Sequence, residues 1–97
     1  MAEICPIVGS IRIIGTKPRL TIIRYLSEGN KCFNDLKRVC KISSKTLSQN
    51  LKYLIKVKIV AVKKEKNKHV YFLTKKGEEI LPILEMFGKW GKKWKVC

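Results

Sequence analysis

Residues 42–56 place amide, hydroxyl and ammonium groups along one side of a predicted helix. Leu47, Leu51 and Leu54 recur at the i, i+4, i+7 spacing of a single apolar stripe. The opposite side carries four polar residues, Lys45, Gln49, Lys52 and Lys56. In a DNA major groove an amide suits adenine and an ammonium suits guanine, whereas further lysines and hydroxyls suit phosphates. This face therefore has the chemistry to recognise a nucleic acid duplex.

Position along this helix divides the predicted roles among its polar residues. The N-terminal residues of such a helix usually point into the groove, so Lys45 and Gln49 are predicted to contact base edges. Phosphate or flanking contacts are predicted for the remaining polar residues, Ser44, Ser48, Lys52, Tyr53 and Lys56. The alternative is an ordinary amphipathic surface helix whose polar side only faces water.

The formal net charge of +15 is concentrated in the middle of the 97-residue chain. Residues 31–76 hold 14 of the 22 lysines and arginines but only two of the seven acidic residues. Such a concentration is typical of a protein that binds a polyanion, because phosphate neutralisation releases counterions. The excess of lysine leaves two alternatives open, a sequence-tolerant architectural DNA-binding protein and a solvated lysine surface of the kind found in heat-adapted proteins.

Composition and spacing argue against several other classes of protein. No run of 18 apolar residues exists, and a proline and an arginine interrupt the N-terminal region, so we expect a cytoplasmic protein without a membrane partner. The cysteines form no C-x-x-C pair and His69 lies far from them, so no metal site is expected. Few, scattered carboxylates and no glycine-rich phosphate loop argue against an enzyme or a cofactor.

Hydrophobic periodicity and capping residues predict the elements that position the polar helix. In chain order these are a helix over 7–14, a helix from Pro18 to Glu28, a short strand at Cys32-Phe33, a helix capped by Asn34 that ends near Cys40-Lys41, and the polar helix capped by Ser43. Alternation after Lys56 predicts strands around 60–63 and 69–73. A last helix starts near Thr74, and Pro82 either kinks it or marks its true start.

This order predicts one winged helix-turn-helix domain over residues 1–97, mainly α with a small β-hairpin. The predicted hairpin tip is basic, and its polar residues are Lys64, Lys66, Asn67 and Lys68. As a wing they would lie along a phosphate backbone or in the minor groove. They would also keep an exposed edge strand from pairing with a neighbouring molecule, and the two roles are compatible.

The order of several short motifs resembles that of HxlR-type transcriptional regulators over nearly the whole chain. The motifs are Cys5-Pro6-Ile7, Ile14-Gly15 followed by Lys17, residues 33–38, Ile42-Ser43, Leu47-Ser48-Gln49-x-Leu51-Lys52-x-Leu54, Tyr71-x-Leu73-Thr74, Gly77, residues 81–84 and Trp90-Gly91. The resemblance implies a homodimeric winged-helix protein that binds double-stranded DNA. It also implies that the N- and C-terminal helices form the dimer and that Ser44 to Lys56 reads the groove.

The chain departs from that family pattern at three places. Pro18 stands where the family usually has tryptophan, the wing is shorter and lacks the usual prolines, and Lys58 occupies a usual glycine. If the chain is left-handed at Lys58, a non-glycine residue costs on the order of 1 kcal/mol. These departures indicate a divergent member and bear on the wing more than on the fold.

The last predicted helix carries more apolar and aromatic surface than a domain of this size covers by itself. Its predicted interface residues are Ile83, Phe87, Trp90 and Trp94. An uncovered stripe of this kind indicates a partner, of which a second copy related by two-fold symmetry is the simplest. The alternative is membrane-surface binding, because residues 90–95 resemble an interfacial amphipathic tail.

Taken together, the polar helix, the basic middle segment and the apolar last helix predict a homodimeric, sequence-specific transcriptional regulator.

Cys5 could add redox chemistry to this function. Some members of the family resemble thiol switches that use a cysteine at this place, near the dimer interface, to sense oxidants or electrophiles. The resemblance therefore gives a thiol-based redox-sensing regulator as an alternative, which needs a lowered thiol pKa. The competing interpretation, which we favour, is that Cys5 is a buried small apolar side chain. Cys97 is expected to be exposed.

Overall fold

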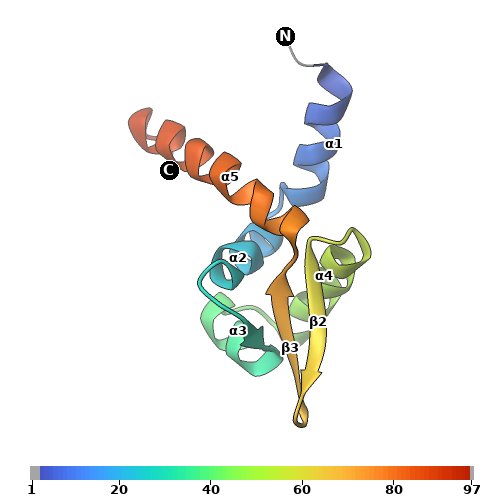
Figure 1. Ribbon diagram of the computed structural model, residues 1–97. Coiled ribbons are helices and arrows are strands. Elements are labelled where there is room, and N and C mark those ends of the chain that lie inside the picture. The colour runs from blue at the N-terminus through green and yellow to red at the C-terminus, as the bar shows by residue number, and fades with distance from the viewer. Residues whose placement is uncertain (1–2, 97) are drawn as a thin grey trace.

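Five helices and three short strands account for most of residues 3–96, which the computed structural model describes (Figure 1). In chain order they are α1 (Ile4–Ile14), α2 (Lys17–Leu26), β1 (Lys31–Cys32), α3 (Phe33–Cys40), α4 (Ser44–Lys56), β2 (Val60–Glu65), β3 (Lys68–Leu73) and α5 (Lys75–Lys93). The predicted fold class, mainly α with a small β-hairpin, is confirmed.

Side-chain hydroxyls begin three of the helices. The Oγ1 of Thr16 accepts a hydrogen bond from the N–H of Arg19 in α2, and the Oγ of Ser43 accepts from the N–H of Thr46 in α4. The Oγ1 of Thr74 does the same for Gly77 in α5. Each hydroxyl satisfies one N–H of a first turn that has no partner within its helix. The predicted cap at Ser43 is confirmed.

The predicted cap at Asn34 is wrong. The residue that precedes α3 is Cys32, which has extended backbone and makes no side-chain capping hydrogen bond. Cys32 pairs with Val70 of β3, so the chain stays extended up to this point and turns helical at Phe33. The short strand therefore sets where α3 starts, and Asn34 lies inside its first turn.

All three prolines lie within helices, and Pro82 and Pro6 bear on the predicted helix bounds. α5 runs unbroken from Lys75 to Lys93 with Pro82 inside it, so the alternative that Pro82 marks the true start of this helix is wrong. Pro82 has no N–H, so it removes one hydrogen bond of the helix ladder without ending the helix. α1 begins at Ile4, one turn before the predicted start, because Pro6 falls in its first turn, where a missing N–H is tolerated.

The sheet is antiparallel in the order β1–β3–β2. Glu65 pairs with Lys68, so Lys66 and Asn67 form the two-residue tip of the hairpin. Lys58, just after α4, has a φ of 66°, which is the left-handed conformation that the family's usual glycine implied.

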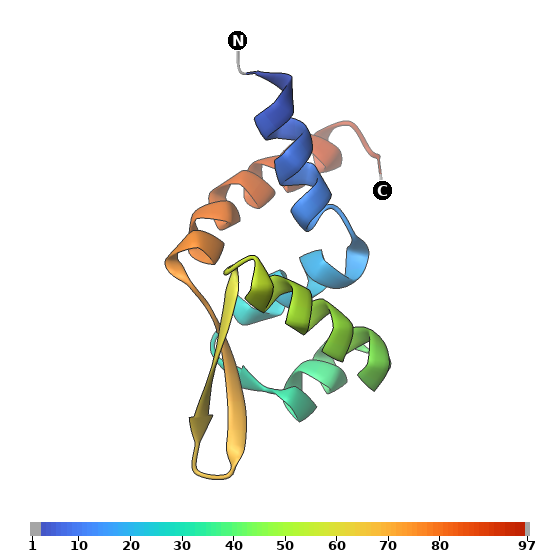
Figure 2. The same ribbon diagram turned by 90° about the vertical axis from the view of Figure 1, so that its right-hand side faces the viewer.

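The core lies between α2, α3, α4 and the base of the sheet. Its most buried large side chains are Ile22, Ile23, Leu36, Leu47, Leu54 and Val60. The apolar stripe predicted for α4 is confirmed, because Leu47, Leu51 and Leu54 are at most 2% exposed. α1 and α5 extend away from this body and diverge from each other in Figure 1, whereas Figure 2 shows them crossing in projection.

Candidate nucleic-acid interface

The outer face of α4 gathers the residues predicted to read DNA. Ser44 and the four polar residues Lys45, Gln49, Lys52 and Lys56 are exposed, and Ser48 is half-buried. Figure 2 shows α4 crossing the front of the domain with the hairpin tip below it. Burial of the leucine stripe fixes this orientation, since turning the polar face inward would expose the core.

A tight turn joins α3 to α4 and holds the two as a helix-turn-helix. Lys41 ends α3 with a φ of 55°, and its N–H donates to the carbonyl of Lys37. Asn50, which sequence reasoning did not assign, donates from Nδ2 to the carbonyl of Thr46 at 2.8 Å. Its amide is therefore engaged with the backbone of α4, whereas the amide of Gln49 is exposed.

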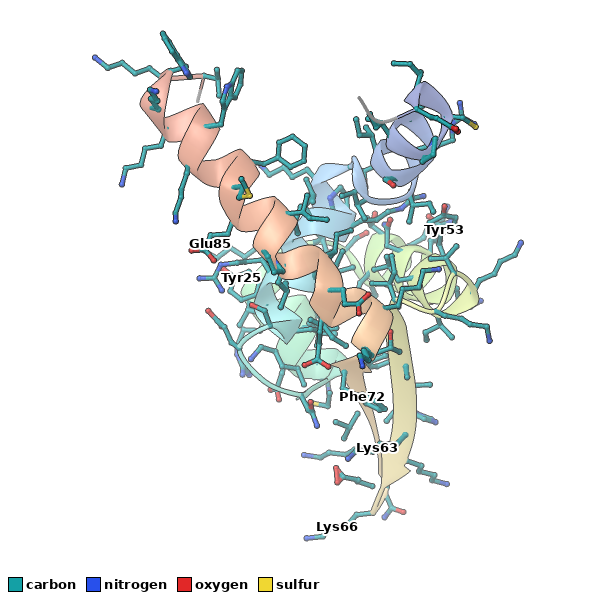
Figure 3. The ribbon with its side chains drawn as sticks, turned by 45° about the horizontal axis from the view of Figure 1, so that its top comes forward. Tyr25, Tyr53, Lys63, Lys66, Phe72 and Glu85 are labelled. Atoms are coloured by element: carbon teal, nitrogen blue, oxygen red, sulfur yellow. The ribbon has the colours of Figure 1, made fainter. Side chains whose placement is uncertain are left out.

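Tyr53 has a contact within the protein that the sequence did not predict. The guanidinium carbon of Arg19 lies 3.8 Å from the centroid of the Tyr53 ring. The Nη1 of Arg19 also donates to the carbonyls of Arg12 and Ile13 in the last turn of α1, at 3.2 and 2.9 Å. Arg19 thus joins α1, α2 and α4, and Tyr53, labelled in Figure 3, is half-buried. Such a cation–π contact stabilises by about 0.5–1 kcal/mol near a surface.

The hairpin presents a basic tip. The predicted wing residues Lys64, Lys66, Asn67 and Lys68 are all exposed. Figure 3 shows Lys66 at the far end of the hairpin and Lys63 above it on the same projection. Lys63 lies 5.5 Å from the Phe72 ring and 3.9 Å from a carboxylate oxygen of Glu65, so its ammonium already has partners.

Neighbouring residues partly offset the two acids of the basic segment. Asp35 accepts hydrogen bonds from the Cys32 thiol and, at 2.9 Å, from Arg38, which hold the pKa of its carboxyl below the ordinary value. Glu65 lies within ion-pair distance of the Lys63 ammonium. Both pairs are exposed and contribute little to stability. The lysines of α4 and of the hairpin tip therefore dominate the electrostatic potential of this surface.

The cysteines differ in their exposure. The favoured interpretation of Cys5 as a buried residue is wrong, because α1 projects from the body and leaves Cys5 exposed. Cys40 is buried, which raises the pKa of its thiol and makes it a poor nucleophile. Cys32 is half-buried. Cys97 lies outside the described residues. Within residues 3–96 no three His, Cys, Asp or Glu side chains gather as metal ligands would.

A second surface is apolar and lies on α1 and α5. The predicted interface residues of α5 are between 52% and 61% exposed, namely Ile83, Phe87, Trp90 and Trp94. α1 exposes a matching stripe of Ile4, Ile7, Val8 and Ile11. No helix among the described residues is long and apolar enough to span a membrane.

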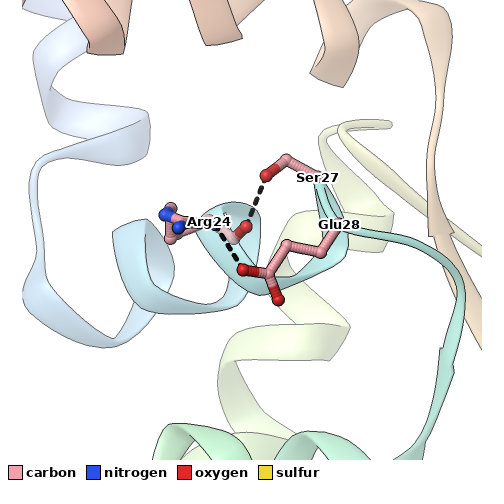
Figure 4. A network of polar contacts seen from close by, with 3 residues as sticks. All are labelled: Arg24, Ser27 and Glu28. Carbon is pink, nitrogen blue, oxygen red and sulfur yellow. Dashed lines mark hydrogen bonds and ion pairs between the residues drawn. The ribbon is translucent and has the colours of Figure 1, made fainter.

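Between these helices and α2 lies an apolar cleft of about 870 Å³. Its lining is mainly aliphatic and aromatic and includes Ile11, Ile14, Leu20, Leu81, Leu84 and Phe87. At its edge the Nη1 of Arg24 lies 2.8 Å from Glu28, and the Ser27 hydroxyl donates to the Arg24 carbonyl (Figure 4). Arg24, Ser27 and Glu85 are the polar residues of a lining that is otherwise mainly apolar.

Known proteins share both the sequence pattern and the fold. The HxlR-like helix-turn-helix family matches residues 13–96. An uncharacterised HTH-type transcriptional regulator of Methanocaldococcus jannaschii, MJ0925, is 33% identical over 88 residues, which cover 86% of this chain and 79% of that protein. The reduced form of the transcriptional regulator YodB from B. subtilis has a TM-score of 0.87 at 25% identity, covering 96% of this chain and 94% of that chain.

A second redox-related structure has the same fold. The redox regulator HypR in its reduced form has a TM-score of 0.83 at 27% identity, covering 91% of this chain and 91% of that chain. These similarities extend over both the helix-turn-helix and the flanking helices. The chain therefore belongs to the HxlR-like helix-turn-helix family of transcriptional regulators.

Proposed function

We propose that the protein is a cytoplasmic homodimer that binds a specific, roughly palindromic DNA site and regulates transcription there. The observation that carries this proposal is the exposed polar face of α4, which combines an amide and lysines above a buried leucine stripe. Each α4 enters the major groove of one half-site. The half-sites lie about 34 Å apart, one helical turn of DNA, or a multiple of that distance.

Within each half-site, Lys45 and Gln49 contact base edges near the N-terminal end of α4. The hydroxyls of Ser44 and Ser48, the ammonium groups of Lys52 and Lys56 and the hydroxyl of Tyr53 contact phosphates or flank the site, and the hairpin tip follows the neighbouring backbone. The contact between Tyr53 and Arg19 favours a phosphate role for this hydroxyl, because it holds the ring in one position.

The apolar stripes of α1 and α5 form the dimer. Their exposed side chains are large, contiguous along each helix, and flank the same apolar cleft. Two-fold symmetry lets each copy cover the stripe of the other with an identical surface. This arrangement presents two α4 helices on one side of the pair, as a palindromic site requires.

Replacing Gln49 by alanine is expected to weaken binding to the preferred DNA site by roughly 5- to 150-fold, the equivalent of about 1–3 kcal/mol. Binding to random duplex should be unchanged, because the amide serves base recognition and carries no charge. The preferred site is first selected from a random pool, and affinities for both duplexes are then measured by titration at one salt concentration.

Lys52→Ala is the matched control. It removes a phosphate contact from the same face and should weaken binding to the selected and the random duplex by the same factor. Equal losses of affinity by Gln49→Ala for the selected and the random duplex would contradict its role in base readout.

A footprint with excess random duplex tests the function itself. A regulator protects one discrete site, whereas an architectural protein, the alternative suggested by the +15 charge, spreads along the DNA.

A second function, redox sensing through Cys5, is favoured by one observation. Cys5 is exposed on α1, next to the apolar stripe that the dimer would use. The similar proteins YodB and HypR were solved in forms described as reduced, and HypR is described as a redox regulator. Oxidation by diamide, which takes up two hydrogens as the Cys5 thiols of the two copies join in a disulfide, would crosslink the dimer helices and shift the position of the two α4 helices.

Diamide treatment is therefore expected to lower the affinity for the selected DNA site on the order of tenfold, within the usual range of coupling energies. Cys5→Ser should abolish the response, and Cys97→Ser, which removes the other candidate for crosslinking, should keep it. Mass spectrometry establishes that Cys5 has been oxidised. Unchanged affinity of protein with oxidised Cys5 would rule out the switch.

A further inference from the structure

Four turns in residues 3–96 place a lysine where the backbone is left-handed. Lys41, Lys58, Lys66 and Lys95 have φ values of 55°, 66°, 54° and 52°, and no other non-glycine residue in this range has a positive φ. Side chains crowd the backbone there, so glycine and asparagine are the residues that usually occupy such positions. The chain thus holds a strained, charged residue at each place where an uncharged one would fit better.

Two of these lysines flank the proposed DNA-reading face. Lys41 ends α3 and precedes Ser43, the cap of α4, so it lies at the end of α4 that enters the groove. Lys66 lies at the tip of the hairpin, at its far end from the body (Figure 3). Both side chains are exposed, and within the described residues neither has a carboxylate within ion-pair distance.

The other two lie elsewhere. The carbonyl of Lys58 accepts a hydrogen bond from the Thr74 hydroxyl at 2.6 Å, which places it beside the start of α5 at the base of the hairpin. Lys95 follows α5, at the end of the helix that projects from the body. Lys41 and Lys66 thus lie at the N-terminal end of α4 and at the hairpin tip, whereas Lys58 follows the opposite end of α4 and Lys95 follows α5.

We propose that Lys41 is a further positioning residue, which contacts a phosphate at the N-terminal end of α4 and, together with the wing residue Lys66 already assigned to the backbone, positions α4 on DNA. Lys41 contacts the backbone where α4 enters the groove, and Lys66 contacts the backbone at the wing. The inference rests on the proposed function and adds the residues that fix the angle of α4. Phosphate contacts of this kind set register and orientation without reading sequence.

Four single substitutions test this inference: Lys41→Gly, Lys58→Gly, Lys66→Gly and Lys95→Gly. Each removes one charge and relieves the same left-handed conformation, so each variant should keep or raise its Tm, by roughly 4 °C. Binding to a random duplex is then measured over a salt series. Lys41→Gly and Lys66→Gly should each lower the slope of log K against log salt by about 0.9, the value of one lost phosphate contact.

Lys58→Gly and Lys95→Gly are matched controls and should keep the wild-type slope. Lys41→Arg, which retains charge and strain, should also keep it. A wild-type slope for both Lys41→Gly and Lys66→Gly, or an equal fall for Lys58→Gly, would overturn the inference while leaving DNA binding intact. Wild-type protein that ignores duplex DNA even at low salt would instead overturn the proposed function and this inference with it.

Discussion

Substituting glutamate for both Phe87 and Trp90 is expected to convert the proposed dimer into monomers. These side chains are 56% and 60% exposed in the single chain, and both lie on the apolar stripe of α5. In the proposed dimer the stripe is buried, and two carboxylates without partners there would cost several kcal/mol. A monomer binds each half-site separately, so affinity for the two-half-site DNA should fall by about 100-fold or more.

Sedimentation equilibrium measures the state of association, and a DNA titration measures the affinity. Lys89→Glu is the matched control, because it lies on the polar side of the same helix with a side chain that is 77% exposed. It changes the net charge by the same two units as the double substitution and should remain dimeric. If the doubly substituted protein, with unchanged helical content, stays a dimer at micromolar concentration, α5 is not the interface.

Replacing Gly77 by alanine is expected to destabilise the domain by about 2–4 kcal/mol and to lower its Tm by about 10–20 °C. Gly77 is buried in the first turn of α5. An added Cβ would collide with the carbonyl oxygen of Ile59 and would come within 3.1 Å of Leu73 Cδ2. Ile59 follows the turn after α4, and its carbonyl also accepts a hydrogen bond from the N–H of Thr74. The segment around Ile59 and the start of α5 therefore cannot move apart freely. Thermal unfolding followed by circular dichroism measures the loss.

Gly88→Ala provides the comparison within the same helix. Nothing lies within 4 Å of a Cβ at Gly88, so alanine there should keep or raise the Tm through its better helix propensity. A Tm for Gly77→Ala within about 2 °C of wild type would show that the contact between the start of α5 and the end of α4 can relax, in contradiction to the close packing seen around Gly77.

Patterns that depend on near neighbours in the chain could be predicted from the sequence. The leucine stripe of α4 follows from a 3.6-residue period, and the Ser43 cap follows from one hydroxyl and the N–H of Thr46 three residues later. The hairpin likewise follows from alternation on both sides of a polar tip. In each case the local preference and the tertiary packing agree, and the predictions are confirmed.

Features that depend on distant contacts were missed or mistaken. Asn34 is a good capping residue by itself, but the pairing of Cys32 with Val70 decides where α3 begins. Cys5 is exposed because α1 leaves the body, which its apolar composition does not indicate. The contact between Arg19 and Tyr53 depends on the angle between α2 and α4, for which no sequence pattern exists.

Arg19 links α1, which would form part of the proposed dimer interface, to α4, which would read the DNA. One side of the guanidinium is anchored to the carbonyls that end α1, and its flat face rests on the ring of Tyr53 in α4. If α1 rotates, Tyr53 must therefore move with it, or the contact between the guanidinium and the Tyr53 ring must break. In the proposed dimer, a change in the angle between the two copies would therefore reach α4 through Arg19 as well as through Ile14, the residue of α1 that is buried in the core.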